Sequence, residues 1–119
     1  MFNNASADSL LQASALVPVV TYVTTPDLID VDAGSLFGVF YVSGLTVGTC
    51  FVQAQGSIDE VTWFDLPADH SVNLTGNGLE YIEFKRAVPR FIRFELTPAG
   101  GFDGQVEVRV RSSSPIIAS

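Results

Sequence analysis

Short runs of β-branched and aromatic residues, broken at close intervals by Gly, Pro, Asp and Asn, fill the chain from Val17 onward. Such runs favour extended backbone, the breaks favour turns, and almost no room is left for helices. We therefore predict an all-β fold of about eight antiparallel strands in a β-sandwich, with jelly-roll and immunoglobulin-like strand orders both open. The expected strands are Val17–Thr24, Leu28–Val31, Leu36–Ser43, Thr49–Gly56, Val61–Leu66, Leu79–Lys85, Arg90–Thr97 and Gln105–Arg111.

The side-chain pattern of three segments predicts which way they face. In QVEVRVR (Gln105–Arg111) the valines alternate with polar residues, so one face is expected in the core and the other in water. In RFIRFEL (Arg90–Leu96) the same alternation places Phe91 outward with Arg93. LFGVFYV (Leu36–Val42) is apolar at nearly every position, which predicts a strand covered on both faces, by the N-terminal segment or by another subunit.

Length and composition indicate a single folded domain. A chain of 119 residues is long enough to bury about two thirds of its unfolded surface in one core. A content of 47% hydrophobic and 16% charged residues is unlike that of a disordered chain. Residues 1–16, rich in Asn, Ser and Ala, are expected to form a flexible or short-helical N-terminal arm. Residues 17–111 are expected to form the sandwich and residues 112–119 a C-terminal tail.

The charge balance argues against nucleic acid as a partner. Thirteen acidic residues against six basic ones give a net charge of −7, which repels a phosphate backbone. Lys85, Arg86 and Arg90 belong to a basic C-terminal third, which is either a contact face for an acidic partner or the alternating charge of solvent-facing strands. No basic residue precedes the first apolar stretch, and no apolar run is long enough for a bilayer. We therefore expect neither a secretion signal nor a membrane partner.

The segment CFVQAQGSIDEVTWFDLP (Cys50–Pro67) reads as a hairpin and holds the only tryptophan. The reversal is predicted at Gly56–Glu60, because Gly tolerates the bend and the Ser and Asp side chains can bond local amides. Trp63 is interpreted as a large aromatic filling the space between the sheets, with Phe64 facing the opposite way. The alternative is a shallow groove whose aromatic rings stack on a sugar. Its residues would be Trp63, Phe64 and Tyr81, with Asp65 and Asn77 as polar partners.

The hairpin also carries a resemblance to known families. Gly56, Ser57, Asp59, Trp63 and Leu66 match the pattern G-S-x-D-x-x-x-W-x-x-L. This pattern resembles a hairpin found in discoidin-like sugar-binding modules and in small β-sandwich structural proteins of tailed bacteriophages. A short, acidic, cysteine-poor chain with an Asn/Ser/Ala-rich start is similar in style to the phage head and tail proteins. The resemblance implies a non-enzymatic virion protein.

The sequence holds no combination of reactive side chains that we expect to be functional. His70 is the only histidine, and its neighbours Asp69 and Ser71 are adjacent in a predicted loop, where adjacent side chains rarely face one another. Cys50 is interpreted as a small core residue rather than a reactive thiolate. Two groups of carboxylates lack the ligand spacing of a calcium loop. They are Asp27, Asp30 and Asp32, and Asp59, Glu60, Asp65 and Asp69. We expect no enzymatic activity, no metal and no cofactor.

The remaining hypotheses concern proteins that act by presenting a surface. The first is a bacteriophage capsid decoration (cement) protein, made in the host cytoplasm and located on the capsid surface of the virion. It would bind the major capsid protein at subunit junctions as a homo-oligomer, with a trimer favoured. Its expected contacts are the arm residues Phe2, Leu10 and Leu11 and the patch Lys85, Arg86, Arg90 and Phe91. The alternatives are a carbohydrate- or receptor-binding module of a phage tail, and a tail or head-completion subunit with no separate ligand.

Overall fold

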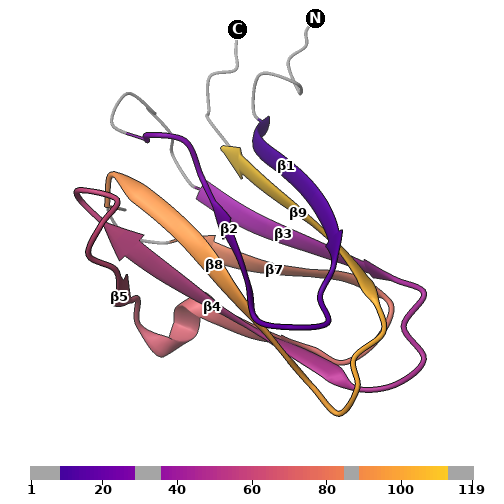
Figure 1. The fold of residues 1–119 in the computed structure, drawn as a ribbon. Coiled ribbons are helices and arrows are strands. Elements are labelled where there is room, and N and C mark those ends of the chain that lie inside the picture. Colours follow the sequence, from indigo (N-terminus) through magenta and orange to yellow (C-terminus); the bar gives the residue numbers. More distant parts are fainter. Residues whose placement is uncertain (1–8, 29–35, 85–88, 113–119) are drawn as a thin grey trace, which may run out of the picture.

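A computed structural model of the protein describes residues 9–28, 36–84 and 89–112. These residues form an antiparallel β-sandwich of two sheets (Figure 1), which confirms the predicted fold class. The four-stranded sheet has the order β1-β9-β3-β7, made of β1 (Ser9–Leu16), β9 (Gln105–Ser112), β3 (Leu36–Ser43) and β7 (Gly78–Phe84). The five-stranded sheet has the order β2-β8-β4-β5, with β6 also paired to β4. Its strands are β2 (Thr21–Thr24), β8 (Phe91–Ala99), β4 (Thr49–Ser57), β5 (Phe64–Asp65) and β6 (Ser71–Leu74).

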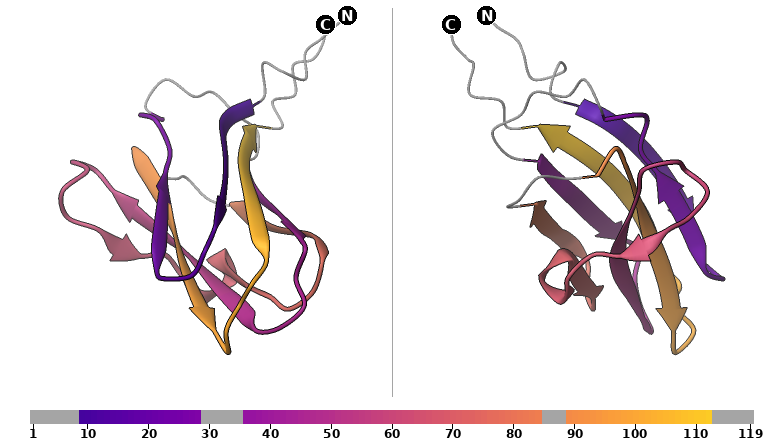
Figure 2. Two further views of the ribbon diagram at one scale, coloured as in Figure 1. Left: turned by 45° about the vertical axis from the view of Figure 1, so that its right-hand side comes forward. Right: turned by 90° about the vertical axis from the view of Figure 1, so that its left-hand side faces the viewer.

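The two sheets lie face to face as two layers (Figure 2). Consecutive strands often belong to different sheets, so the chain crosses between the layers. One crossing, residues 17–20, joins β1 to β2 and carries the buried Val17. A second crossing joins β8 to β9 through residues 100–104. Within the five-stranded sheet, the short 3-10 helix η2 (Ala68–His70) leads from β5 into β6. These crossings close the sandwich around one core.

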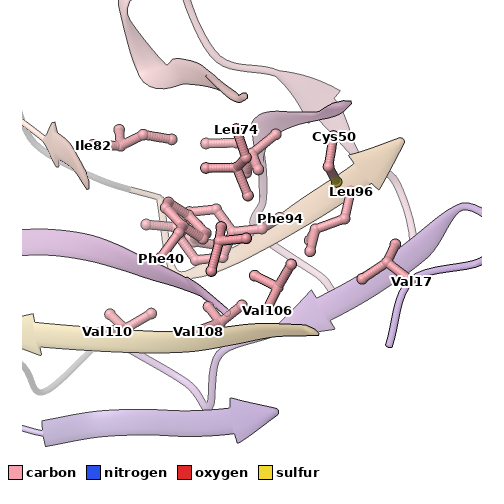
Figure 3. Close-up of a cluster of buried hydrophobic side chains, with 14 of the residues drawn as sticks. Val17, Phe40, Cys50, Leu74, Ile82, Phe94, Leu96, Val106, Val108 and Val110 are labelled. Atoms are coloured by element: carbon pink, nitrogen blue, oxygen red, sulfur yellow. The ribbon is translucent and has the colours of Figure 1, made fainter. Parts of the chain in front are cut away.

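The core fills the space between the layers, as the alternation predicts (Figure 3). Every second residue of β3 and β9 is buried, including Phe40, Val42 and Val108. Phe40 meets Phe94 of β8 edge to face, with ring centroids 5.1 Å apart, so the largest core side chains join the two sheets. Cys50 is fully buried among these residues, which confirms its interpretation as a core residue.

The N-terminal arm requires a correction, because residues 9–16 form β1 rather than a helix or a flexible segment. β1 pairs antiparallel with β9, placing Leu11 opposite Val110 and Leu16 opposite Gln105. Ser and Ala have low intrinsic strand preference, but the edge of β9 offers backbone hydrogen bonds that override it. Leu10 and Leu11 therefore lie within the sheet. Residues 1–8, which include Phe2, and most of the predicted tail, residues 113–119, lie outside the described residues.

Three predicted strands also differ from the observed ones. The predicted strand Val61–Leu66 is reduced to β5, because the amides of Val61 and Thr62 donate to the Asp59 carboxylate instead of to a neighbouring strand. The predicted strand Val17–Thr24 is interrupted by the crossing, which leaves only β2. Of the predicted strand Leu28–Val31, only Leu28 is described; it is buried and lies outside any strand. β6 was not predicted.

Candidate functional site

The outer side of the four-stranded sheet carries a group of large apolar side chains. Alternation along β3 and β7 turns Phe37, Val39, Tyr41, Leu79 and Tyr81 away from the core, and we call these five residues the apolar face. Val39 lies directly opposite Tyr81, and Tyr41 opposite Leu79. Tyr41 is 53% exposed, Leu79 59% and Tyr81 57%. The face therefore presents one contiguous apolar surface to solvent.

Charged residues border the apolar face on both sides. On β9, the next strand of the sheet, Arg111 lies opposite Phe37 and Arg109 opposite Val39. On β7, Glu83 lies opposite Phe37. Arg109 donates to Glu107 of its own strand at 2.8 Å. An apolar centre with a charged rim is the usual composition of a protein–protein interface.

The structure does not show a second layer over β3, which the sequence predicted to be covered on both faces. Its even-numbered residues face the core, and its odd-numbered residues face outward and are half-buried or exposed. No described segment of the chain lies over Tyr41, Leu79 or Tyr81 enough to bury them. The cover that the sequence predicts stays a prediction.

The G-S-x-D motif forms a self-contained loop, as its residues predicted. The buried Ser57 hydroxyl donates to Asp59 at 2.9 Å and accepts from the Glu60 amide at 2.8 Å. Asp59 accepts from the amides of Thr62 and Val61, both at 2.9 Å. These hydrogen bonds lower the pKa of the Asp59 carboxyl, and the bond from the Thr62 amide has the largest effect. The hydrogen bonds explain the residue types of the motif by loop geometry alone.

Trp63 does not fill the space between the sheets, and that interpretation was wrong. It lies on the outer face of the five-stranded sheet, with the guanidinium carbon of Arg93 4.4 Å from its ring centre. The same guanidinium lies 4.2 Å from the ring of Tyr22. Tyr22 belongs to β2 and Trp63 directly precedes β5, and these two strands lie on opposite sides of β8. We call Tyr22, Trp63 and Arg93 the stacked-arginine cluster.

Polar side chains hold this cluster in place. Arg93 donates to Gln55 at 2.7 Å, and Gln55 in turn donates to Asp65 at 2.8 Å. The Tyr22 hydroxyl donates to Glu95 at 3.0 Å, and this bond to a carboxylate raises the pKa of the phenol. Tyr22 was not among the predicted site residues. The alternation in TYVT nevertheless turns it to the outer side of the sheet when Val23 faces the core.

The structure does not bring together the predicted sugar-stacking residues. Tyr81 belongs to the four-stranded sheet, whereas Trp63 and Phe64 belong to the five-stranded one. Phe64 is 48% exposed, and its ring lies against Gly56. The Asn77 side chain, from the loop between β6 and β7, bonds to the loop that follows β3. It accepts from the Leu45 amide at 2.8 Å and donates to the Leu45 carbonyl at 3.1 Å.

The carboxylate of Asp103 also holds the loop that follows β3. Asp103 accepts from the Thr46 hydroxyl, from the Thr46 amide at 2.8 Å and from the Val47 amide at 3.1 Å. These hydrogen bonds, led by that from the Thr46 hydroxyl, lower the pKa of Asp103. Residues 44–48 are thus tied to the β6–β7 loop by Asn77 and to the β8–β9 loop by Asp103.

The predicted partner patch is described only in part. Lys85 and Arg86 lie outside the described residues. Arg90 forms an ion pair with Asp27, with its Nη2 2.7 Å from the carboxylate, which ties the start of β8 to the segment after β2. Phe91 points outward as predicted but is half-buried, with the guanidinium of Arg90 5.6 Å from its ring centre.

The side chains with potential reactivity are His70 with its neighbours Asp69 and Ser71, and Cys50. His70 is buried against Phe84, with ring centroids 5.1 Å apart. Its Nδ1 lies 2.9 Å from an Asp69 oxygen, but the angles are not those of a hydrogen bond. The Ser71 hydroxyl donates to the Ala68 carbonyl at 2.7 Å. Burial raises the pKa of the Cys50 thiol to about 11.

Residues 9–28, 36–84 and 89–112 hold neither a metal site of clustered ligands nor a membrane-spanning helix. No group of three or more His, Cys, Asp or Glu residues is arranged there to hold a metal ion. Asp30 and Asp32 of the first carboxylate group fall outside this range. Within it, no helix has the length and apolar character needed to cross a bilayer.

The fold and these surfaces define an all-β sandwich with two distinct outer faces. No protein-family model matches the chain, and no curated protein is significantly similar to it.

Proposed function

We propose that this protein is a non-enzymatic structural subunit that acts by binding other protein subunits through its apolar face. The observation that carries the proposal is the exposure of Tyr41, Leu79 and Tyr81 side by side on one sheet. Single exposed apolar residues are ordinary on a protein surface, but a contiguous group with a charged rim marks an interaction site. Covering this group removes apolar area from water, which stabilises the complex by about 25 cal/mol for each Å² of apolar surface buried.

The setting that we propose is the surface of a bacteriophage capsid, where the protein would decorate junctions between major capsid proteins. Its support is the resemblance of the hairpin pattern and the small, acidic sandwich with a single, buried cysteine. Many copies on one shell would convert a modest affinity per contact into a stable layer. In this proposal the protein is a homo-oligomer, made in the host cytoplasm and carried on the virion.

The structure alters which residues would make the contacts. Leu10 and Leu11 are strand residues of β1, so an arm that reaches a neighbour would consist of residues 1–8 with Phe2 as its anchor. Arg90 already binds Asp27, which leaves Lys85, Arg86 and Phe91 as the patch residues to test. The apolar face is an addition to both sets.

The test compares Leu79→Lys with the matched control Val61→Lys. Both residues are exposed and apolar, but Leu79 lies on the apolar face and Val61 in the hairpin loop of the other sheet. Capsids assembled from the major capsid protein of the same genome are sedimented with each variant. We expect Leu79→Lys to lose co-sedimentation and Val61→Lys to retain it. Equal retention by both variants, with unchanged far-ultraviolet circular dichroism, would overturn the proposal.

A second candidate function is carbohydrate binding by the stacked-arginine cluster. The observation in its favour is that two aromatic rings lie beside donors and acceptors, namely Arg93, Gln55 and Asp65, which suit the hydroxyl groups of a sugar. Trp63 is the only tryptophan, so its fluorescence reports on this site directly. Titration with a panel of neutral and acidic oligosaccharides should shift its emission. Emission that ignores every sugar in the panel removes this candidate.

A further inference from the structure

We infer that the apolar face binds a second copy of this chain, face to face, about a two-fold axis that runs parallel to β3. The inference rests on the proposed function, because it names the protein subunit that the apolar face binds. That subunit is a second copy of this chain, so direct contacts with the capsid are left to the arm and the patch. It commits to a symmetric dimer, whereas the sequence alone favoured a trimer. The arrangement of charges around the face carries it.

Three strands of the four-stranded sheet present their outward side chains in rows. The first row is Arg111, Phe37 and Glu83, from β9, β3 and β7 in turn. The second row is Arg109, Val39 and Tyr81, and the third is Glu107, Tyr41 and Leu79. In each row the β3 residue is central and apolar. The first row has a positive residue at one end and a negative residue at the other.

A two-fold axis along β3 turns one sheet over onto the other and exchanges the β9 and β7 sides. Each row of one copy then meets the same row of the second copy in reverse order. Arg111 of one copy comes to lie over Glu83 of the second, and the reciprocal pair forms at the same time. Arg109 comes over the ring of Tyr81, an arrangement that suits a cation–π contact. Phe37, Val39 and Tyr41 meet their own counterparts at the centre.

The other in-plane axis, perpendicular to the strands, gives a poorer match. It keeps β9 over β9 and reverses the order of the rows. The central row then places Arg109 over Arg109 of the second copy, and like charges facing each other are repulsive. It brings Arg111 over Glu107 of the second copy, but Glu107 already pairs with Arg109 of its own strand. Each axis also places one carboxylate over Leu79, Glu83 for the perpendicular axis and Glu107 for the parallel one, so the central row is what separates the two. Neither Glu83 nor Arg111 forms an ion pair within the described part of the chain, so both remain free to make the contact that the parallel axis offers.

The size of the sheet limits the affinity. The three strands that overlap, spaced about 4.8 Å apart and about 8 residues long at about 3.4 Å per residue, present a face of roughly 400 Å². Such a contact falls toward the small end of specific interfaces, which argues for a dimer that dissociates in the micromolar range. A concentration-dependent mass is therefore part of the expectation.

The experiment is a charge swap measured by sedimentation velocity and light scattering over about 1 to 500 μM protein, a range that brackets micromolar dissociation. The wild-type chain should approach twice its 12.8 kDa mass at high concentration. Arg111→Glu and Glu83→Arg should each weaken the dimer by about tenfold or more, because each introduces two like-charge contacts. The double variant Arg111→Glu/Glu83→Arg should return to within about threefold of the wild type, because both pairs are restored with reversed sign.

The control is Glu80→Lys, on the same strand as Glu83 but on the opposite side of the sheet, which should leave the dimer unchanged. Circular dichroism and melting of each variant show whether it folds. Where a charge reversal fails to fold, the neutral variants Arg111→Gln and Glu83→Gln replace it, with an expected weakening of a few-fold.

Three results would overturn the inference: a monomer at every concentration, a trimeric mass, or a double variant weaker than both single ones. The failure of the proposed function looks different. If the wild type is monomeric but Leu79→Lys still loses capsid co-sedimentation, the second copy is excluded and the apolar face remains a protein-binding surface.

Discussion

Gly38 of β3 lies under the tip of the Phe94 ring, and replacing it with alanine should crowd the centre of the core. A Cβ on Gly38 would lie 2.7 Å from Cζ and 3.0 Å from Cε1 of Phe94. Carbon atoms in contact prefer about 3.5–4.0 Å, so the ring must retreat by about 1 Å. Phe94 is fully buried and is held by Phe40 at 5.1 Å and Phe84 at 6.2 Å, so it has nowhere to move without further shifts.

The expected net cost of Gly38→Ala is about 1.5 kcal/mol. Overpacking of a filled core typically costs about 1–3 kcal/mol, and we take about 2. The loss of backbone freedom in the unfolded chain returns about 0.5 kcal/mol. For a domain of this size the melting temperature should fall by about 6 °C. Urea unfolding followed by far-ultraviolet circular dichroism measures the same difference at constant temperature.

Two comparisons make this prediction specific to the ring contact. Gly76→Ala is the control, because a Cβ there meets nothing within 4 Å, and we expect it to be nearly neutral. In a Phe94→Leu background the ring tip is gone, so Gly38→Ala should become neutral or stabilising. A Gly38→Ala cost that is the same in both backgrounds would refute the reasoning, because it would show that the ring does not cause the strain.

Four further predictions concern other parts of the molecule. Gly48→Ala should cost more than Gly38→Ala, about 3 kcal/mol or above in urea unfolding, because the residue has a φ of +85° and its Cβ would lie 2.4 Å from a backbone nitrogen; a cost below that of Gly38→Ala would contradict this. The lowered pKa of Asp103, held by the Thr46 hydroxyl and amide, means that its contribution to stability is present above the unfolded carboxyl pKa of about 3.9 and is lost as pH falls through the lower folded value. Asp103→Asn should therefore flatten the acid side of a stability–pH curve, and an unchanged acid limb would exclude the effect. Cys50, with a pKa of about 11 and no exposed surface, should react with a thiol reagent at about pH 8 only as fast as the protein unfolds; immediate labelling of the native protein would contradict its burial. Arg93→Lys should shift the tryptophan emission to longer wavelength and cost about 0.5–1 kcal/mol, because an ammonium cannot stack flat on the two rings; an unchanged spectrum would mean that the stack is not formed in solution.

The sequence predicted those strands whose side chains alternate with period two. Five strands begin and end within about two residues of their expected bounds, namely β3, β4, β7, β8 and β9. They were predictable because the alternation of apolar and polar residues indicates which face of each strand is buried. β1 was missed because its stabilising partner, β9, lies about 90 to 100 residues away along the chain, and pairing at such a distance leaves no local signal.

Trp63 shows a different limit of sequence reasoning. A large aromatic after a turn is usually part of the core, and the alternation around it was read on the assumption of a strand from Val61. The Asp59 carboxylate captures the amides of Val61 and Thr62, so that strand does not form and the period-two argument does not apply. The Trp63 ring instead stacks on the guanidinium of Arg93, a side chain that the sequence did predict to face outward.

The sequence predicted only the β3 part of the apolar face. LFGVFYV indicated that β3 has a second apolar surface, but which residues lie beside it depends on register. The pairing of Tyr41 with Leu79 and of Val39 with Tyr81 becomes known only once β7 is placed against β3.

The two outer faces of the sandwich differ in how far their side chains are already hydrogen-bonded, and this difference supports the position that we propose for a protein partner. On the five-stranded sheet the two rings of the stacked-arginine cluster cover one guanidinium, and the nearby Gln55, Asp65 and Glu95 are hydrogen-bonded to one another or to the cluster. A protein partner binding there would have to replace contacts that the chain already makes. On the four-stranded sheet more than half of the surface of Tyr41, Leu79 and Tyr81 stays in water, although the Tyr81 ring also lies 6.2 Å from that of Phe37. Burial of this exposed surface is available to a partner. Of the two outer faces, the apolar face is therefore the one on which we place a partner. Glu83 and Arg111, which form no ion pair among the described residues, lie on its opposite borders and would orient the contact.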